Sequence, residues 1–294
     1  MRGRGQSALG MLSFVGLNMI GVVAYFHPFV FASATDPDSR WFTHSTDGPI
    51  VFAGLAALCL ALIVADLSSG ALNSRSLAAL GVLSALAAVL RTVTLPAGAS
   101  FYFFILIIGG YAFGARLGFL LGVLSFFLSA VVTGGFGPWL PFQMFAAGWI
   151  AMSLGLVRAL TGRGPHPRLD VAIMVAAGVF WGFAYGFITN LWFWPFVVSG
   201  SDVAYEPGLG LLETLRRYWN FYLITSAGWD LLRAGANAVL LLFLARPLLR
   251  AMLRFHERFS WHAEPLLETP ATKADDEASA LDPAPRADSA GRSP

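Results

Sequence analysis

Apolar residues occur along this chain in long blocks, separated by short polar or Gly- and Pro-rich segments. A helix that crosses a bilayer needs about 17 to 25 mostly apolar residues, and runs near that length recur as far as residue 244. The runs cover residues 9–26, 50–65, 77–90, 101–132, 141–160, 171–188 and 218–244. This pattern predicts an all-α polytopic membrane protein.

The run over residues 101–132 decides the topology. As one helix, its 32 residues would measure roughly 48 Å, well beyond a hydrocarbon core of about 30 Å. Its centre reads GYAFGARLG and holds Gly114 and the one charge of the run, Arg116. We therefore expect two short helices joined at residues 113–117, which gives eight spans in all.

The distribution of arginine agrees with this hairpin. With eight spans and both termini in the cytoplasm, most arginines fall on the inner side, as the positive-inside rule requires. A single span over residues 101–132 would remove that bias. The prediction is a multi-pass protein of the cell (inner, cytoplasmic) membrane with both termini cytoplasmic. The inner residues are Arg2, Arg4, Arg75, Arg116, Arg158, Arg163, Arg168, Arg246, Arg250, Arg254 and Arg258, and the outer ones are Arg40, Arg91, Arg216 and Arg217.

The composition excludes several classes of function. Of the 294 residues, 56% are hydrophobic and 12% charged, and the mean hydropathy is +0.66, which a water-soluble domain cannot cover with its own polar surface. Lys273 is the one lysine and no P-loop is present, which excludes a P-loop ATPase. The sequence has no HExxH or GxSxG motif and no second cysteine beside Cys59. We expect neither an enzyme nor a metal or cofactor site, and the basic residues indicate membrane orientation rather than nucleic-acid binding.

Three segments predicted on the outer side are rich in Gly, Pro and Trp: residues 91–100, the turn TGGFGPWLPFQ at 133–143, and residues 190–220. Tryptophan is common at the level of the lipid headgroups, so each ring alone fits an aromatic belt. Because several gather on one side, they also fit the wall or lid of an external pocket. These residues are Trp139, Trp192, Trp194 and Trp219.

Ionisable residues within the spans are few, and each is costly in lipid. Asp230 and Arg233 stand three positions apart on one predicted helix, close enough to pair. A pair that neutralises itself is structural, whereas a proton or substrate relay needs Asp230 to be unpaired. Arg91, at the outer end of its span, either snorkels to the interface or presents its five donors to a carboxylate or phosphate of a ligand.

Small residues recur at helical spacing in two of the spans. Such stripes allow close backbone approach, either within the chain or to another membrane protein. The residues are Gly118 and Gly122 in one span, and the interleaved pairs Gly81 with Ala85 and Ser84 with Ala88 in another.

From about residue 77 to residue 244, the chain resembles the substrate-specific S component of an energy-coupling factor (ECF) vitamin transporter. The resemblance rests on the hairpin IIGGYAFGARLGFLLGVLSFFLSA and the following TGGFGPWLPFQMFAAGWIAMSLG, within six helices whose ends are both cytoplasmic. It implies a protein that captures a small molecule from outside with high affinity and topples in the membrane when it is coupled to a T component and two ATPases. Nucleotide-binding motifs are then expected on the other chains.

The resemblance also predicts partner contacts and a domain organisation. The family marks the coupling face of its first core helix with alanine-x-x-x-alanine, and here the corresponding small residues are Gly81, Ser84, Ala85 and Ala88. Two spans before residue 77 depart from the six-helix pattern. We expect a tail and two additional transmembrane helices over residues 1–76, a substrate-binding core over 77–245, a basic amphipathic extension over 246–262, and a disordered tail over 263–294.

The external loops would cover the ligand. An aromatic mouth with few charges fits a large, ring-rich and mostly neutral molecule, cobalamin or another corrinoid first, with riboflavin, thiamine and queuosine as alternatives. The candidate wall consists of Arg91, Trp139, Gln143, Asn190, Trp192, Trp194, Trp219 and Asn220.

Three other classes of protein remain open at this point. A self-sufficient secondary transporter is expected to carry inverted repeats, and the sequence has no evident internal repeat. A membrane enzyme acting on lipids would need an acid or nucleophile near the interface, and a structural partner in a membrane complex would need neither. Candidate groups for the enzyme are Asp230, His44, Asp36, Asp38 and Asp47.

Overall fold

The computed structural model of the chain describes residues 2–31, 40–68, 74–93, 101–162, 166–196 and 202–260. Within these ranges every regular element is a helix. The chain divides after Phe259, and the following description applies to the unit before that point. The predicted tail over residues 263–294 and residues 94–100 of the predicted first outer segment lie outside the described residues.

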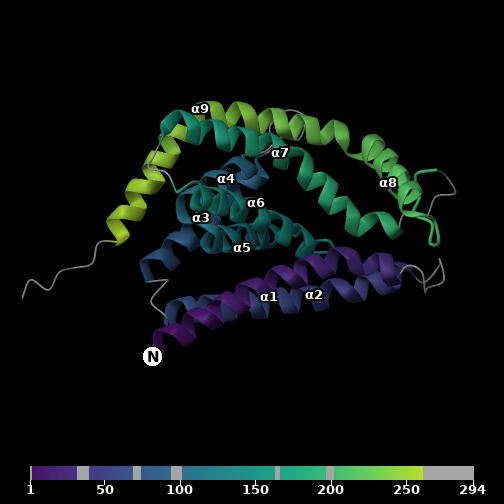
Figure 1. The fold of residues 1–294 in the computed structure, drawn as a ribbon, viewed down its shortest axis with the longest axis horizontal. Helices are drawn as coiled ribbons and strands as arrows, with labels where there is room; N and C mark the ends of the chain where they lie inside the picture. Colours follow the sequence, from purple (N-terminus) through teal and green to yellow (C-terminus); the bar gives the residue numbers. More distant parts are fainter. Residues whose placement is uncertain are drawn as a thin grey trace, which may run out of the picture. The chain divides into compact units, whose positions relative to one another are not determined.

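The helices follow one another with short connections (Figure 1). Six of those in the described ranges are long and apolar enough to cross a membrane, and two shorter apolar helical stretches, Met11–Phe26 and Tyr102–Phe113, add to them. The protein is an all-α polytopic membrane protein. Its elements are α1 (Arg2–Phe31), α2 (Arg40–Ser68), α3 (Ser74–Thr92), α4 (Tyr102–Phe113), α5 (Ala115–Thr133), α6 (Leu140–Thr161), α7 (Pro167–Phe193), the 3-10 helix η3 (Trp194–Phe196), α8 (Leu211–Thr225) and α9 (Ala227–Ser260).

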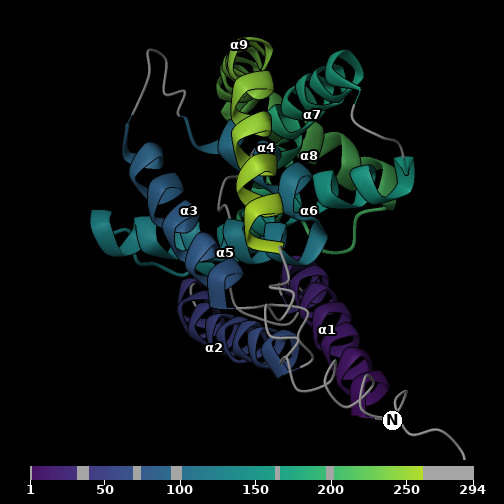
Figure 2. The same ribbon diagram turned by 90° about the vertical axis from the view of Figure 1, so that its left-hand side faces the viewer.

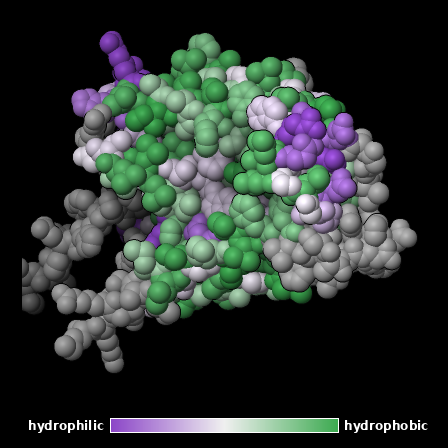
Figure 3. Space-filling view, turned by 45° about the vertical axis from the view of Figure 1, so that its right-hand side comes forward, coloured by the Kyte–Doolittle hydropathy of each residue, from purple (hydrophilic) through white to green (hydrophobic). Residues whose placement is uncertain are grey.

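The helices lie in layers. Helices α1 and α2 run along one side of α3 to α6, and α7 and α9 run along the other side (Figures 1 and 2). Large apolar side chains such as Leu160 (86% exposed) and Phe243 (75% exposed) point out of the bundle. Figure 3 shows one face on which hydrophobic residues dominate and hydrophilic ones gather in small areas. This surface suits contact with lipid chains.

The predicted break in the long apolar run is confirmed. Helix α4 ends at Phe113, α5 begins at Ala115, and Gly114 between them has φ of +87°, a conformation that side-chain-bearing residues rarely adopt. The two helices return on each other, because Tyr102 at the start of α4 contacts Ser125 in the second half of α5. The segment is therefore a hairpin of two helices.

The glycines around this hairpin provide close packing within the chain. Gly118 and Gly122 of α5 both face α6, where a Cβ atom would collide with the backbone of Ala151 and Ala147. Gly110 of α4 meets the backbone of Ala151 in the same way. The glycine stripe predicted for α5 is thus an intramolecular contact that joins α4, α5 and α6.

The predicted last span, over residues 218–244, is present but its predicted bounds are wrong. The chain forms two helices here, α8 and α9, with Ser226 between them at φ of −131°. Helix α8 carries the charged residues Glu213, Arg216 and Arg217 and is strongly amphipathic, so it is not among the described helices long and apolar enough to span. The spanning segment begins after it, over Ala227–Arg254.

Side-chain contacts define two opposite ends of the bundle. We call one of them the arginine-rich end. It contains the start of α3, the turn between α4 and α5, the end of α6 and the start of α7. At the other, the tryptophan-rich end, lie the end of α3, the turn between α5 and α6, the end of α7, and α8. The arginines of the first end whose side chains the structure describes are Arg75, Arg116, Arg158, Arg168, Arg246, Arg250 and Arg254.

The two N-terminal helices are attached to the core at both ends. At the tryptophan-rich end, Tyr25 donates a hydrogen bond to the carbonyl of Phe142 (2.6 Å). Near the middle of α1, Asn18 accepts a hydrogen bond from the indole of Trp149 (2.8 Å). At the arginine-rich end, Arg116 pairs with Asp66 of α2 (2.8 Å). Helices α1 and α2 are therefore an integral part of the fold.

Candidate functional site

Arg91 lies in the last turn of α3 and is half-buried against α5. Its guanidinium donates a hydrogen bond to the hydroxyl of Ser129 (2.9 Å) and lies 4.0 Å from the centre of the Phe126 ring, both on α5. Such a cation–π contact contributes roughly 0.5–2 kcal/mol. Within the described part of the chain, no carboxylate pairs with Arg91. The arginine therefore keeps a positive charge and spare donors at the tryptophan-rich end.

A series of aromatic rings leads from Arg91 into the bundle. Phe126 packs edge-on against Tyr102 at 5.8 Å, Tyr102 against Phe103 at 5.5 Å, and Phe103 against Tyr185 of α7 at 4.9 Å. The Tyr102 hydroxyl lies 3.0 Å from the Ser125 hydroxyl. We call Phe126, Tyr102, Phe103 and Tyr185 the aromatic wall. All four side chains are buried, at most 8% exposed, and two of them carry a hydroxyl at the ring edge.

Asp230 and Arg233 of α9 form the predicted ion pair, at 2.5 Å. Asp230 is 1% exposed and also accepts a hydrogen bond from Tyr222 (2.9 Å). Arg233 also donates to the carbonyl of Gly182 (3.1 Å) and lies over the ring of Tyr185 at 5.0 Å. Each charged group is thus satisfied by partners within the chain, as a structural pair requires.

Two glycines of α7 allow this helix to pack closely on α9, which carries the Asp230–Arg233 pair. A Cβ atom on Gly186 would collide with the carboxylate of Asp230, and one on Gly182 would collide with the backbone of Ala234. The close packing of α7 on α9 places Arg233 beside the aromatic wall. The wall therefore lies between two arginines, Arg91 on α3 and Arg233 on α9.

The predicted tryptophans have different surroundings. Trp192 is buried against Phe142 of α6, with ring centres 4.9 Å apart. Trp194 is also buried and donates to the carbonyl of Val203 (2.7 Å). Trp139 and Trp219, by contrast, are 45% and 51% exposed. Trp192 and Trp194 are therefore part of the packed interior, whereas Trp139 and Trp219 lie at the surface, where a ligand can reach them.

The predicted amides lie near the same end. Asn190 donates to the hydroxyl of Ser226 (2.5 Å) and so joins α7 to the break before α9. Gln143 and Asn220 are half-buried on α6 and α8. The structure thus brings Asn190 near the Asp230 end of the site.

Trp139 belongs to a different part of the tryptophan-rich end. Its indole folds back over Gly137, where a Cβ atom would collide with it. The adjoining turn and the start of the described span in α2 enclose a hollow of about 360 Å³, lined by Pro49, Phe52, Phe136, Gly137, Pro138, Leu140 and Pro141. The turn TGGFGPWLPFQ therefore packs against the additional helices.

Sequence reasoning missed most of the aromatic wall. Tyr102, Phe103 and Tyr185 lie in apolar runs whose pattern does not separate lipid-facing rings from enclosed ones. Tyr102 could have been identified, because a tyrosine hydroxyl at the first position of an apolar helix needs a hydrogen-bond partner. Arg233 was identified as part of a pair, but its contact with Phe103 depends on the packing of α4 against α7 and α9.

These features define a multi-pass membrane protein with arginines and aromatic rings enclosed at one end of its bundle. The family model of the ECF transporter, substrate-specific component, matches residues 75–245, which is more than half of the chain, and the chain belongs to that family. No curated protein and no solved structure matches it significantly.

Membership makes the chain a substrate-specific component of an ECF transporter. It implies a small-molecule substrate and association with the ECF T and ATPase components. The family is one of transporter subunits, not of enzymes. Helices α1 and α2 precede the matched segment.

Proposed function

We propose that the chain is the membrane-embedded substrate-binding subunit of an ECF-type importer. It captures a vitamin-like small molecule at the tryptophan-rich end and delivers it through a separate T component and ATPases. The observation that carries this proposal is Arg91, a cation fixed beside the aromatic wall and without a carboxylate partner in the described residues. A guanidinium in such a place is suited to a polar or anionic group of a ligand.

The remaining residues of the site have separate roles in this proposal. The aromatic wall supplies flat apolar contact for a ring system. The Asp230–Arg233 pair is already neutralised, so it holds α9 in place and does not relay protons. The exposed ring of Trp219 covers the ligand after it enters, whereas Trp139 belongs to the turn that packs against α2.

The orientation follows from the charges. The arginine-rich end gathers seven arginines whose side chains the structure describes, and the positive-inside rule favours the cytoplasm for such an end. The tryptophan-rich end then faces outward and both termini are cytoplasmic. This arrangement agrees with capture of the ligand from outside the cell membrane.

The contact with the T component is proposed for one face of α3. Gly81 and Ala85 are exposed, and Gly81 has open space where a Cβ atom would lie. Ser84 and Ala88, which belong to the second predicted pair, are buried within the chain. Gly81 and Ala85 are therefore the pair that can admit a partner helix closely.

Cobalamin or another corrinoid is our first candidate substrate, because an aromatic mouth with few charges fits a large, ring-rich and mostly neutral molecule. Riboflavin, thiamine and queuosine are the alternatives, and their compact rings suit the enclosed aromatic wall. Purification of the chain from its native membrane, followed by mass spectrometry of the extracted small molecules, tests the proposal. We expect one of these compounds to be enriched, together with co-purifying T and ATPase subunits. A preparation with neither would contradict the proposal.

A further inference from the structure

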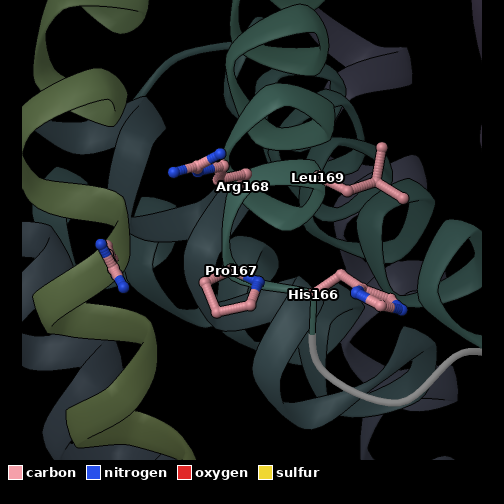
Figure 4. A pocket seen from close by; sticks show the side chains of 5 residues that line it. His166, Pro167, Arg168 and Leu169 are labelled. Atoms are coloured by element: carbon pink, nitrogen blue, oxygen red, sulfur yellow. The ribbon is translucent and has the colours of Figure 1, made fainter.

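A second hollow lies at the arginine-rich end, away from the substrate site. It measures about 510 Å³ and lies where the start of α7 meets α9. The side chain of Arg168 points toward α9, whereas His166 and Leu169 point away from it (Figure 4). The lining residues are His166, Pro167, Arg168, Leu169 and Arg246.

The hollow carries positive charge that the surrounding protein does not neutralise. Neither Arg168 nor Arg246 forms an ion pair with any described carboxylate. The acid in the first turn of α7, Asp170, is buried and accepts a hydrogen bond from Tyr111 (2.7 Å). Two guanidinium groups that share a gap repel each other unless an anion lies between them.

The hollow also lies where apolar surface gives way to basic surface. On α9, Leu242 is 60% and Phe243 is 75% exposed. From Arg246 onward, the exposed positions of the same helix include Arg250 and Arg254, one and two turns further along. A ligand at this boundary would meet apolar surface on one side and cations on the other, as a lipid does with its chains and its headgroup.

We propose that this hollow binds the phosphate headgroup of an anionic phospholipid from the leaflet at the arginine-rich end. Arg168 and Arg246 donate hydrogen bonds to the phosphate oxygens, and the acyl chains lie on the apolar surface of α9. The site is separate from substrate capture. If the lipid-binding proposal is wrong, the proposed transport function is unaffected.

Native mass spectrometry of the detergent-purified protein tests this site. The protein is titrated with phosphatidylglycerol and, in parallel, with phosphatidylcholine of the same acyl chains. We expect tighter binding of phosphatidylglycerol. Replacing Arg168→Gln and Arg246→Gln together should weaken that binding by roughly thirtyfold, since each arginine near an anionic headgroup contributes a factor of roughly five. Arg168→Lys with Arg246→Lys keeps both charges and should retain most of it.

The matched control is Arg250→Gln with Arg254→Gln, which removes the same charge outside the hollow. This variant should retain most of the phosphatidylglycerol binding, because neither arginine lines the hollow. If both glutamine variants lose phosphatidylglycerol binding equally, the lipid is attracted to the basic surface as a whole, and the proposal of a specific site in the hollow is wrong. Displacement of the lipid by inorganic phosphate alone would show that the hollow takes a free anion and would overturn the assignment to lipid.

Discussion

Arg116 donates a hydrogen bond to Asp66 across 2.8 Å and so joins the turn between α4 and α5 to the end of α2. The pair connects a helix that begins before the family-matched segment to the hairpin at the centre of that segment. Helix α4, with 12 residues, is roughly 18 Å long and shorter than a hydrocarbon core of about 30 Å. The carboxylate therefore neutralises an arginine that the short hairpin holds near the bilayer.

Loss of this pair should loosen the attachment of α1 and α2. For Asp66→Asn we expect a lower thermal unfolding temperature in detergent, equivalent to about 1.5–3 kcal/mol, because Arg116 loses a charged hydrogen-bond partner. The charge-reversed combination, Asp66→Arg with Arg116→Asp, should recover part of the loss. A reversed protein less stable than either single variant would show that the pairing itself is unimportant.

The control for this experiment is an exposed ion pair. Glu213 pairs with Arg216 at 2.8 Å, and hydrogen bonds from Arg216 and Arg217 lower the pKa of Glu213 from its usual 4.5. The contribution of the ionised Glu213 to the stability of the fold is present above the unfolded-state pKa. It is lost as the pH falls through the lowered pKa of the folded state. At pH 7 the pair is formed, yet Glu213→Gln should hardly change the unfolding temperature.

The glycine contacts predict opposite effects for two alanine substitutions. Gly110→Ala should destabilise the protein by about 1–3 kcal/mol, because its Cβ atom would collide with the backbone of Ala151. Gly81→Ala meets open space and should stabilise α3 by up to about 1 kcal/mol. Thermal unfolding of both variants measures the difference. Equal effects would contradict the packing of α4 on α6.

The Asp230–Arg233 pair predicts strong coupling between two substitutions. Asp230→Asn alone should cost about 3–5 kcal/mol, because it leaves Arg233 without its counter-charge. The double variant Asp230→Leu with Arg233→Met should be markedly more stable than the single one, since the uncompensated charge is gone. A double-mutant cycle by thermal unfolding measures the coupling. Additive losses would argue that the two residues act independently.

Much of the fold could be predicted from the apolar pattern and the glycines. The break at Gly114 followed from the excess length of one run, and the pairing of Asp230 with Arg233 followed from their spacing. The division of residues 211–260 into α8 and α9 did not, because the apolar run continues across Ser226. The neighbours of Arg91 could not be predicted either, since Ser129 and Phe126 reach it only through the packing of α3 on α5.

Docking of the T component can be tested on α3. Gly81→Leu should reduce co-purification of the T component severalfold and leave the unfolding temperature nearly unchanged, because the new side chain enters open space. Gly235→Leu is the matched control, since Gly235 of α9 is also exposed and also has open space beside it. Equal losses in the two variants would argue against a specific contact at Gly81.

Arg91 should determine ligand affinity. Once the ligand is identified, Arg91→Gln is expected to weaken its binding by about 10- to 100-fold, the effect of losing a charged hydrogen-bond donor. Isothermal titration calorimetry on the purified chain measures this change. Arg216→Gln removes an exposed arginine of α8 and should bind like the native chain. An unchanged affinity in Arg91→Gln would exclude Arg91 from the site.

The sidedness of the two ends tests the account most directly. Ser74→Cys and Asp202→Cys, each in a Cys59→Ala background, place one thiol at the arginine-rich end and one at the tryptophan-rich end, both at exposed positions. A membrane-impermeant maleimide applied to intact cells should label position 202 at once and position 74 only after permeabilisation. Labelling of both positions from the same side would contradict the hairpin at Gly114 and, with it, an outward-facing site at Arg91.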